Sequence, residues 1–218
     1  KSEGEVVVAF EFNGVNLAGT KVVAFEDIMQ GDKLIVSHAD INDEDQTVVF
    51  PKIGTTLTDK RGSHTVATAD EVTLIDKVGY SNLIAGKTYT MKGTLMVKTT
   101  DEKGNVTTEE LKDKDGNAVT ATAEFTPEEA NGSVNVEFKF DGSTFDGKSL
   151  VAFEDCYLGE TSVAEHKDAS DENQTITFPS VHTTMTSDKT KSHMAEYAKD
   201  VKLVDVVSYT GLTPGVEY

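Results

Sequence analysis

The chain has 218 residues and carries 38 acidic against 20 basic side chains, which gives a formal net charge of −18. This surplus of negative charge repels a polyanion and excludes nucleic-acid binding, and no apolar run is long enough to predict a membrane-spanning helix. The single cysteine excludes an internal disulfide framework and a cysteine-based zinc site, and we expect neither a metal nor a cofactor.

In chain order, the first expected element is a β-strand at residues 6–12, because valine or phenylalanine stands at every second position. The same period of two recurs at residues 87–98 and, more cleanly, at residues 134–140. Turns rich in glycine, asparagine and aspartate separate such segments, and no stretch has the pattern of an amphipathic helix of three turns. The sequence therefore predicts an all-β protein.

The chain also repeats itself at a shift of 128 residues. Residues 2–58 align with residues 130–186 without a gap, and 24 of the 57 paired positions are identical. After one extra residue at Ser187 the shift becomes 129, and residues 74–89 match residues 203–218. Self-similarity at a fixed period indicates a tandem array of one structural unit.

The repeat predicts where the units begin and end. One complete repeat domain covers residues 51–178, whereas residues 1–50 match the C-terminal part of a domain and residues 179–218 match the N-terminal part of the next. Short strands, tight turns and this unit length indicate tandem immunoglobulin-like (CnaB-like) antiparallel β-sandwiches. Pro51 and Pro179 stand at the junctions without a glycine-rich linker, which favours short and stiff connections. We expect the array to continue beyond this segment.

Five polar residues of the complete unit stand where apolar residues are expected. Strand alternation turns Thr55 toward the core, Asp76 interrupts an apolar run, and Glu154 ends another. Gln174 opens the last strand of the unit, eight residues after His166. Equivalent residues recur in the partial repeats, namely Glu26, His38, Gln46, Thr183 and Asp205.

Together these side chains supply a nucleophile, a base, two carboxyl groups and a carboxamide. A hydroxyl becomes a good nucleophile when a neighbouring histidine takes its proton. Two carboxyl groups in a dry core cannot both ionise, so one stays protonated and can donate a hydrogen bond to the oxygen of an attacked amide. The chemistry predicts a threonine–glutamine ester that forms once, with loss of ammonia and without a cofactor.

The segments VAFED, H-x-D-x-x-D-x-x-Q-T, P-x-I-G-T-T and Y-x-x-L-x-x-G-x-x-Y resemble the VaFE-repeat, or Thr–Gln ester-bond, domains of Gram-positive surface proteins. The resemblance implies an autocatalytic ester between Thr55 and Gln174, with His166 as the base and Asp76 and Glu154 as the carboxyl pair. Each partial repeat lacks half of this set, so we expect the bond only in the complete unit.

The same resemblance implies a cellular role. It implies a structural stalk segment of an adhesin or pilus-like array, extracellular and anchored to the cell wall, whose chemistry ends with its own cross-link and is not enzymatic turnover. The partners it implies are the neighbouring repeats of the array, with a host-surface ligand at a distant tip.

Three alternatives stay open at this point. A ligand-binding adhesin module would hold a host glycan or protein. A hydrolase would use Thr55, His166 and an acid as a triad, and it would need an open pocket above a free Thr55 hydroxyl. An isopeptide bond would use Lys52 with Asn or Asp, although the recurrence of Thr and Gln in both copies favours the ester.

Overall fold

The structure, a computed structural model, describes residues 3–218; the first two residues of the predicted segment 1–50 lie outside the described residues. Strands and two short 3₁₀ helices make up its regular elements, so the prediction of an all-β protein is confirmed. The elements in chain order are η1 (Val15–Leu17), β1 (Lys21–Val23), β2 (Glu26–Gln30), β3 (Lys33–His38), β4 (Thr47–Val49), β5 (Lys52–Asp59), β6 (Val72–Ser81), β7 (Tyr89–Thr100), β8 (Val106–Glu110), β9 (Thr120–Phe125), β10 (Gly132–Phe140), β11 (Ser149–Leu158), β12 (Thr161–His166), η2 (Glu172–Gln174), β13 (Thr175–Thr177), β14 (Ser180–Ser187) and β15 (Leu203–Thr210).

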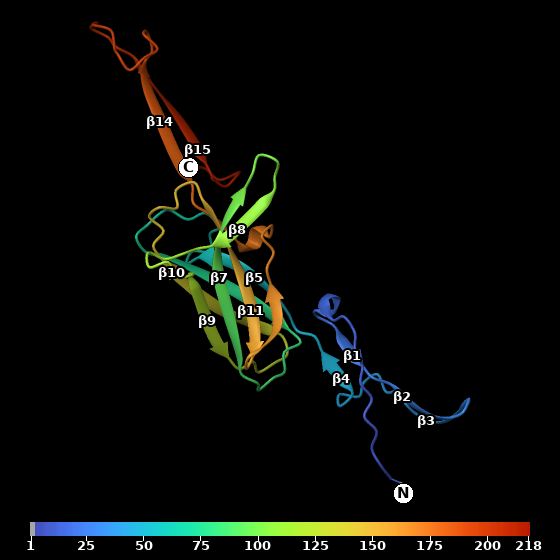
Figure 1. Ribbon diagram of the computed structural model, residues 1–218. Helices are drawn as coiled ribbons and strands as arrows, with labels where there is room; N and C mark the ends of the chain where they lie inside the picture. Colours follow the sequence, from blue (N-terminus) through green and yellow to red (C-terminus); the bar gives the residue numbers. More distant parts are fainter. Residues whose placement is uncertain (1–2) are drawn as a thin grey trace.

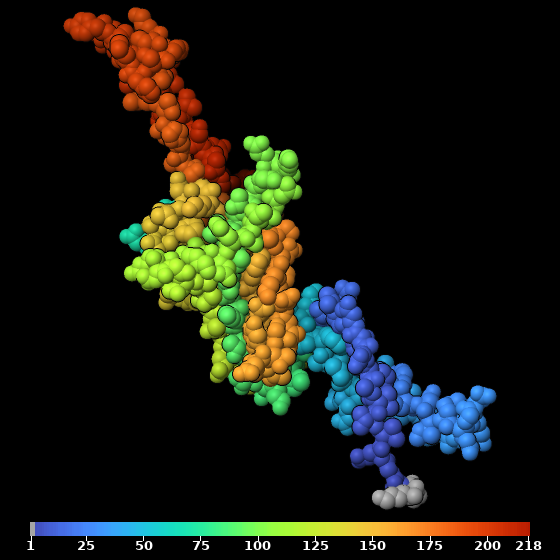
Figure 2. Space-filling view, in the orientation of Figure 1, coloured from blue at the N-terminus to red at the C-terminus, as the bar shows by residue number. Residues whose placement is uncertain are grey.

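Three parts follow one another along an elongated molecule (Figure 1). The N-terminal part holds two small antiparallel pairs, β1 with β4 and β2 with β3, and the C-terminal part is the β14–β15 hairpin at the opposite end (Figure 2). The buried apolar side chains all lie between Ile53 and Phe178 among the described residues. The closed hydrophobic core therefore belongs to the central part.

The central part is a sandwich of two antiparallel sheets. One sheet has the order β10-β6-β5, and the other has the order β12-β11-β7-β8, with β13 beside β11 and β9 beside β7. Alternation along β5 buries every second residue, so Ile53, Thr55 and Leu57 face the core while Lys52 and Thr56 face outward. The prediction that Thr55 points inward is confirmed.

The partial repeats show how much of this burial depends on the facing sheet. Ile53 is 2% exposed in the complete unit, whereas its counterpart Val181 in β14 is 65% exposed. Leu57 and its counterpart Met185 differ in the same way. The same strand pattern buries its apolar side chains only where the second sheet covers them.

The strand predicted at residues 6–12 is wrong, because those residues form no regular element and lie exposed. Their counterpart β10 pairs along its whole length with β6. Residues 1–50 correspond to residues 129–178 and contain no counterpart of β6. Alternating apolar residues without a partner strand leave their backbone groups to water. The strand predicted at residues 87–98 forms as β7.

Candidate cross-link site

Four of the predicted site residues meet in the core of the complete unit. Thr55 lies on β5, Asp76 on β6, Glu154 on β11 and Gln174 in η2, and all four are buried. The β5–β6 register pairs Thr55 with Val78 and places Asp76 two residues further along the same face. Both sheets and the turn before the last strand thus contribute to one buried polar cluster.

Gln174 contacts Thr55 directly. Its Nε2 donates hydrogen bonds to Thr55 Oγ1 at 2.6 Å and to Glu154 Oε2 at 3.0 Å. An amide carbon lies about 1.33 Å from its nitrogen, so Gln174 Cδ lies within about 4 Å of the hydroxyl oxygen, close to the separation from which a nucleophile attacks. The two side chains stand in hydrogen-bond contact across 119 residues of chain.

The turn that precedes β13 holds Gln174 in this position. Asp171 caps η2, because its side chain accepts a hydrogen bond from Asn173 N and its carbonyl accepts one from Gln174 N at 3.2 Å. Thr175 Oγ1 also donates to the Asp171 carbonyl. The glutamine is therefore fixed from its backbone side, and its amide points to the first strand.

The burial of the Asp76–Glu154 pair favours a proton on one of its carboxyl groups. Burial, followed by the hydrogen bond and the charge of Asp76, raises the pKa of Glu154 to about 11. Burial also raises the pKa of Asp76, and it outweighs the lowering by the neighbouring Glu154 and Thr55 groups. Two ionised carboxyls would leave both Asp76 oxygens and Glu154 Oε1 buried without a hydrogen-bond partner. A proton on Glu154 lets Oε1 donate to one Asp76 oxygen while Oε2 accepts from Gln174. The Gln174 carbonyl oxygen, Oε1, is also buried without a hydrogen-bond partner.

His166 lies at the solvent edge of the cluster. It stands opposite Glu154 in the register of β11 and β12. Its side chain is about a quarter exposed. Its Nε2 binds Asp171 Oδ2 at 3.1 Å, it lies close enough to lower the pKa of Asp76, and it makes no hydrogen bond to Thr55. The structure thus joins Thr55, Gln174 and the two carboxyls in the core, and places the histidine at their border.

Two residues of this site were not predicted from the sequence. The first is Asp171, which orients His166 and caps the turn that carries Gln174. Its signal was present, because it is the second aspartate of the H-x-D-x-x-D-x-x-Q motif. The partial repeat keeps the same pair, with His38 Nε2 at 2.7 Å from Asp43 Oδ2.

The second missed residue is Gly93 on β7, directly opposite Glu154. A Cβ at this position would lie 3.2 Å from Glu154 Oε1 and would overlap the Phe138 ring. Glycine therefore leaves space for the Phe138 ring and for the Glu154 carboxyl beside it. Its signal was a glycine at an inward-facing position of an otherwise apolar strand face.

The two partial repeats hold the counterparts of the cross-link residues at opposite ends of the molecule. In the N-terminal part, Gln46 Nε2 donates to Glu26 Oε2 at 3.0 Å, the same contact that Gln174 makes with Glu154. Thr183 on β14 and Asp205 on β15 are exposed at the other end. Neither partial repeat contains both reacting side chains.

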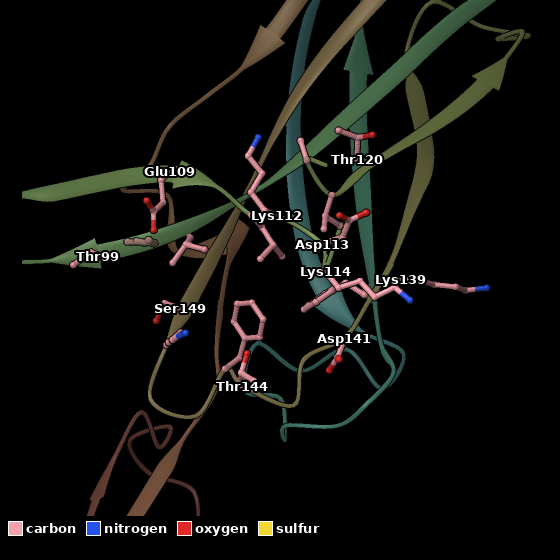
Figure 3. A pocket seen from close by; sticks show the side chains of 18 of the residues that line it. Thr99, Glu109, Lys112, Asp113, Lys114, Thr120, Lys139, Asp141, Thr144 and Ser149 are labelled. Carbon is pink, nitrogen blue, oxygen red and sulfur yellow. The ribbon is translucent and has the colours of Figure 1, made fainter. Parts of the chain in front are cut away.

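A groove of about 1,130 Å³ lies elsewhere on the central part, between the end of β8, the 113–119 turn and the 141–149 loop (Figure 3). None of the predicted site residues lines it. Its rim combines five lysines, including Lys112 and Lys114, with four acidic residues, including Glu109. The charge of this groove selects no class of ligand, and Thr55 is not among the residues that line it.

Residues 3–218 contain no helix of the length and apolarity required to cross a bilayer. Across that same range, histidine, cysteine and acidic side chains do not converge in groups of three on a position for a metal ion.

Comparison with known protein families places this arrangement in context. The family model for the T-Q ester bond containing domain matches residues 1–50, 51–178 and 179–218. The chain belongs to this family. The match confirms the resemblance to ester-bond domains drawn from the sequence motifs.

Solved structures show more distant likeness to this T-Q ester bond protein. Two crystal forms of a bacterial adhesin from Mobiluncus mulieris, described as containing intramolecular disulfide, isopeptide and ester bond cross-links, align at 14% and 16% identity. Each alignment covers 72% of this chain and 76% of that chain, with a TM-score of 0.48. A putative β-galactosidase from Bacteroides fragilis aligns over 55% of this chain and 17% of that chain, at 12% identity and a TM-score of 0.38. No curated protein matches the chain.

Proposed function

We propose that the chain is a load-bearing stalk segment of an extracellular, cell-wall-anchored adhesin or pilus-like array. Residues 51–178 form the complete repeat domain, which closes an ester between Thr55 and Gln174. The observation that carries the proposal is the 2.6 Å contact between Thr55 Oγ1 and Gln174 Nε2 in the buried core. The partners are the neighbouring repeats, of which residues 1–50 and 179–218 are parts.

The reaction proceeds by acyl transfer from nitrogen to oxygen. His166, oriented by Asp171, takes the proton of the Thr55 hydroxyl, directly or through one water, and Oγ1 attacks Gln174 Cδ. The amide oxygen gains negative charge. Gln174 Oε1 is buried without a hydrogen-bond partner in the structure, so the amide turns this oxygen toward Glu154, and the proton of the carboxyl pair then stabilises the charge. The Cδ–Nε2 bond then breaks, His166 returns its proton to the nitrogen, and ammonia leaves. One C–O bond replaces one C–N bond, without redox chemistry or a cofactor.

Burial explains why the product persists. Glu154 and Gln174 have no exposed surface, and Thr55 has little. Water therefore has no open route to the ester carbonyl, and the reaction ends after one turnover instead of continuing to hydrolysis. A closed core of this kind argues against the hydrolase alternative.

The position of the bond explains its mechanical value. Thr55 lies on the first strand of the unit, and Gln174 lies immediately before β13, the last strand. Tension that enters at β5 and leaves at β13 passes through the ester, so the sheet hydrogen bonds between them carry little of it. Gln46 precedes Thr55 by nine residues, and Thr183 follows Gln174 by nine residues. With a bond in every repeat, only this short junction of main chain would bear load between cross-links.

Intact mass spectrometry of the 218-residue chain tests the proposal. The wild type should be lighter than its formula by one ammonia, whereas Thr55→Ala and Gln174→Ala should match their formulae. Thr56→Ala is the matched control, because Thr56 neighbours Thr55 but faces outward, and it should lose ammonia like the wild type. A wild-type mass equal to the formula would refute the cross-link.

A chemical test separates the ester from an isopeptide. Lys52 is exposed and points away from the core, so Lys52→Ala should leave the mass loss intact. Alkaline hydroxylamine should cleave the link in the unfolded wild type, because it attacks esters and spares amides. Loss of the cross-link in Lys52→Ala, or resistance to hydroxylamine, would favour the isopeptide.

A further inference from the structure

Asn82 connects the complete domain to the part of the chain that precedes it. It is one of two non-glycine residues with positive φ among residues 3–218, at φ 59°, a conformation that asparagine tolerates better than most residues. Its Nδ2 donates to the carbonyls of Thr20 at 3.3 Å and Phe50 at 3.4 Å. Those two carbonyls belong to the pairing that closes the preceding part, where Gly19 N donates to Phe50 O and Phe50 N donates to Thr20 O.

The junction between the complete domain and the part of the chain that follows it, the second junction, is built in the same way as the first. Gly211 is the counterpart of Asn82 at the 129-residue shift, and it also has positive φ, at 72°. Gly147 N donates to Phe178 O at 3.0 Å and Phe178 N donates to Lys148 O at 2.9 Å. These bonds reproduce those of Gly19, Phe50 and Thr20.

Gly211 has no side-chain amide like that of Asn82. Instead, its backbone lies close to the end of the preceding repeat. A Cβ on Gly211 would lie 2.7 Å from Thr177 Cγ2 and 3.3 Å from Pro179 Cα. Thr65 Oγ1 and Thr213 Oγ1 add a hydrogen bond of 2.6 Å from one part to the next. The turn thus meets the end of the preceding repeat at both junctions: a polar side chain reaches the Phe50 carbonyl at the first, and the backbone packs against Thr177 and Pro179 at the second.

We propose that the turn after the second strand of each repeat, residues 81–84 and 210–213, is a docking surface for the preceding repeat of the same chain. It holds consecutive repeats at one fixed angle. Pro51 and Pro179 assist, because each fixes φ in the connecting residue. The surface acts between repeats, whereas the ester acts within one, so neither feature requires the other.

The second junction offers a matched pair of variants. Gly211→Ala and Gly215→Ala both place a Cβ on a residue with positive φ, but Gly215 has no atom within 4 Å of that Cβ. Spin labels on Glu124→Cys and Thr184→Cys, both at exposed positions, report the distance across the junction by pulsed electron paramagnetic resonance. Cys156 is buried, and burial raises the pKa of its thiol, so it will not be labelled.

The wild type and Gly215→Ala should give one narrow distance distribution, and Gly211→Ala should give a broad one. A broad distribution in the wild type, or an unchanged one in Gly211→Ala, would overturn the proposal. Intact mass of the same samples reports the ester separately, so a failed junction and a failed cross-link are distinguishable.

The first junction provides an independent arm of the test. Asn82→Gly permits the same backbone conformation and removes only the amide that binds Thr20 and Phe50. With labels on Ser37→Cys and Glu124→Cys, the distance distribution should broaden, while the loss of ammonia within the complete domain stays as in the wild type. A distribution as narrow as that of the unsubstituted chain would show that Asn82 does not hold the junction.

Discussion

Replacing Thr55 with valine keeps a branched side chain on β5 but removes the hydroxyl that the ester requires. The bond closes a loop of 119 residues between Thr55 and Gln174. In the chain-entropy treatment of cross-links, a loop of this length contributes about 4.9 kcal/mol to the free energy of unfolding at 25 °C. For a unit of about 128 residues, an unfolding entropy of about 2.1 cal/mol/K per residue converts this to a melting temperature about 18 °C lower.

The assay is thermal unfolding of the 218-residue chain, followed by circular dichroism and paired with intact mass. Thr55→Ser is the matched control, because it keeps the nucleophilic oxygen; it should lose ammonia and melt close to the wild type. Thr55→Val also leaves the buried Gln174 amide with one hydrogen-bond acceptor fewer, which costs about 1–3 kcal/mol. The free energy of unfolding should therefore fall by at least the contribution of the cross-link. A wild type that has lost ammonia and yet melts within about 3 °C of Thr55→Val would refute the loop-entropy reasoning.

Three further predictions concern the residues around the bond. Gly93→Ala pushes a methyl group into the Phe138 ring and against the Glu154 carboxyl, so the fraction of chain that loses ammonia should fall; full conversion would show that the space is not needed. Asp171→Asn keeps a side-chain oxygen to cap the turn but removes the charge that orients His166, so bond formation followed by mass over time should slow by about 10²-fold or more, and an unchanged rate would contradict that role. The third prediction concerns pH, in the uncross-linked Thr55→Val chain. Folded Glu154 keeps a proton that the unfolded chain releases above about pH 4.5, so the free energy of unfolding in urea should fall as pH rises from 5 to 8, by up to about 1.4 kcal/mol per unit. Adding Glu154→Gln should flatten this slope, and an equal slope in both chains would place the titrating group elsewhere.

Local pattern alone determined much of this protein. Period-two alternation predicted the strands and turned Thr55 toward the core, because neighbouring side chains of a strand point to opposite faces whatever the strand packs against. The 128-residue shift predicted the repeated organisation for the same reason, since it is a property of the sequence itself. The five-residue set stood out because polar groups at apolar positions are costly unless they have partners.

Tertiary structure decided which of these patterns are realised. The strand predicted at residues 6–12 does not form where β6 has no counterpart, whereas the same pattern forms β10 where β6 is present. Gly93 could be recognised as the space for Glu154 only once β7 and β11 were paired. The position of His166 at the border of the cluster, held by Asp171, likewise depends on how β12 packs against β5.

The contact between Thr55 and Gln174 shows most clearly what local sequence pattern cannot predict. Each residue was identified from its own segment, but 119 residues separate them, and nothing local fixes the distance between two segments so far apart. The sheets set that distance when they pack face to face and leave the two side chains no other polar partner but the carboxyls. Alternation determines which way a side chain points, and only the packing of the sheets determines what it meets.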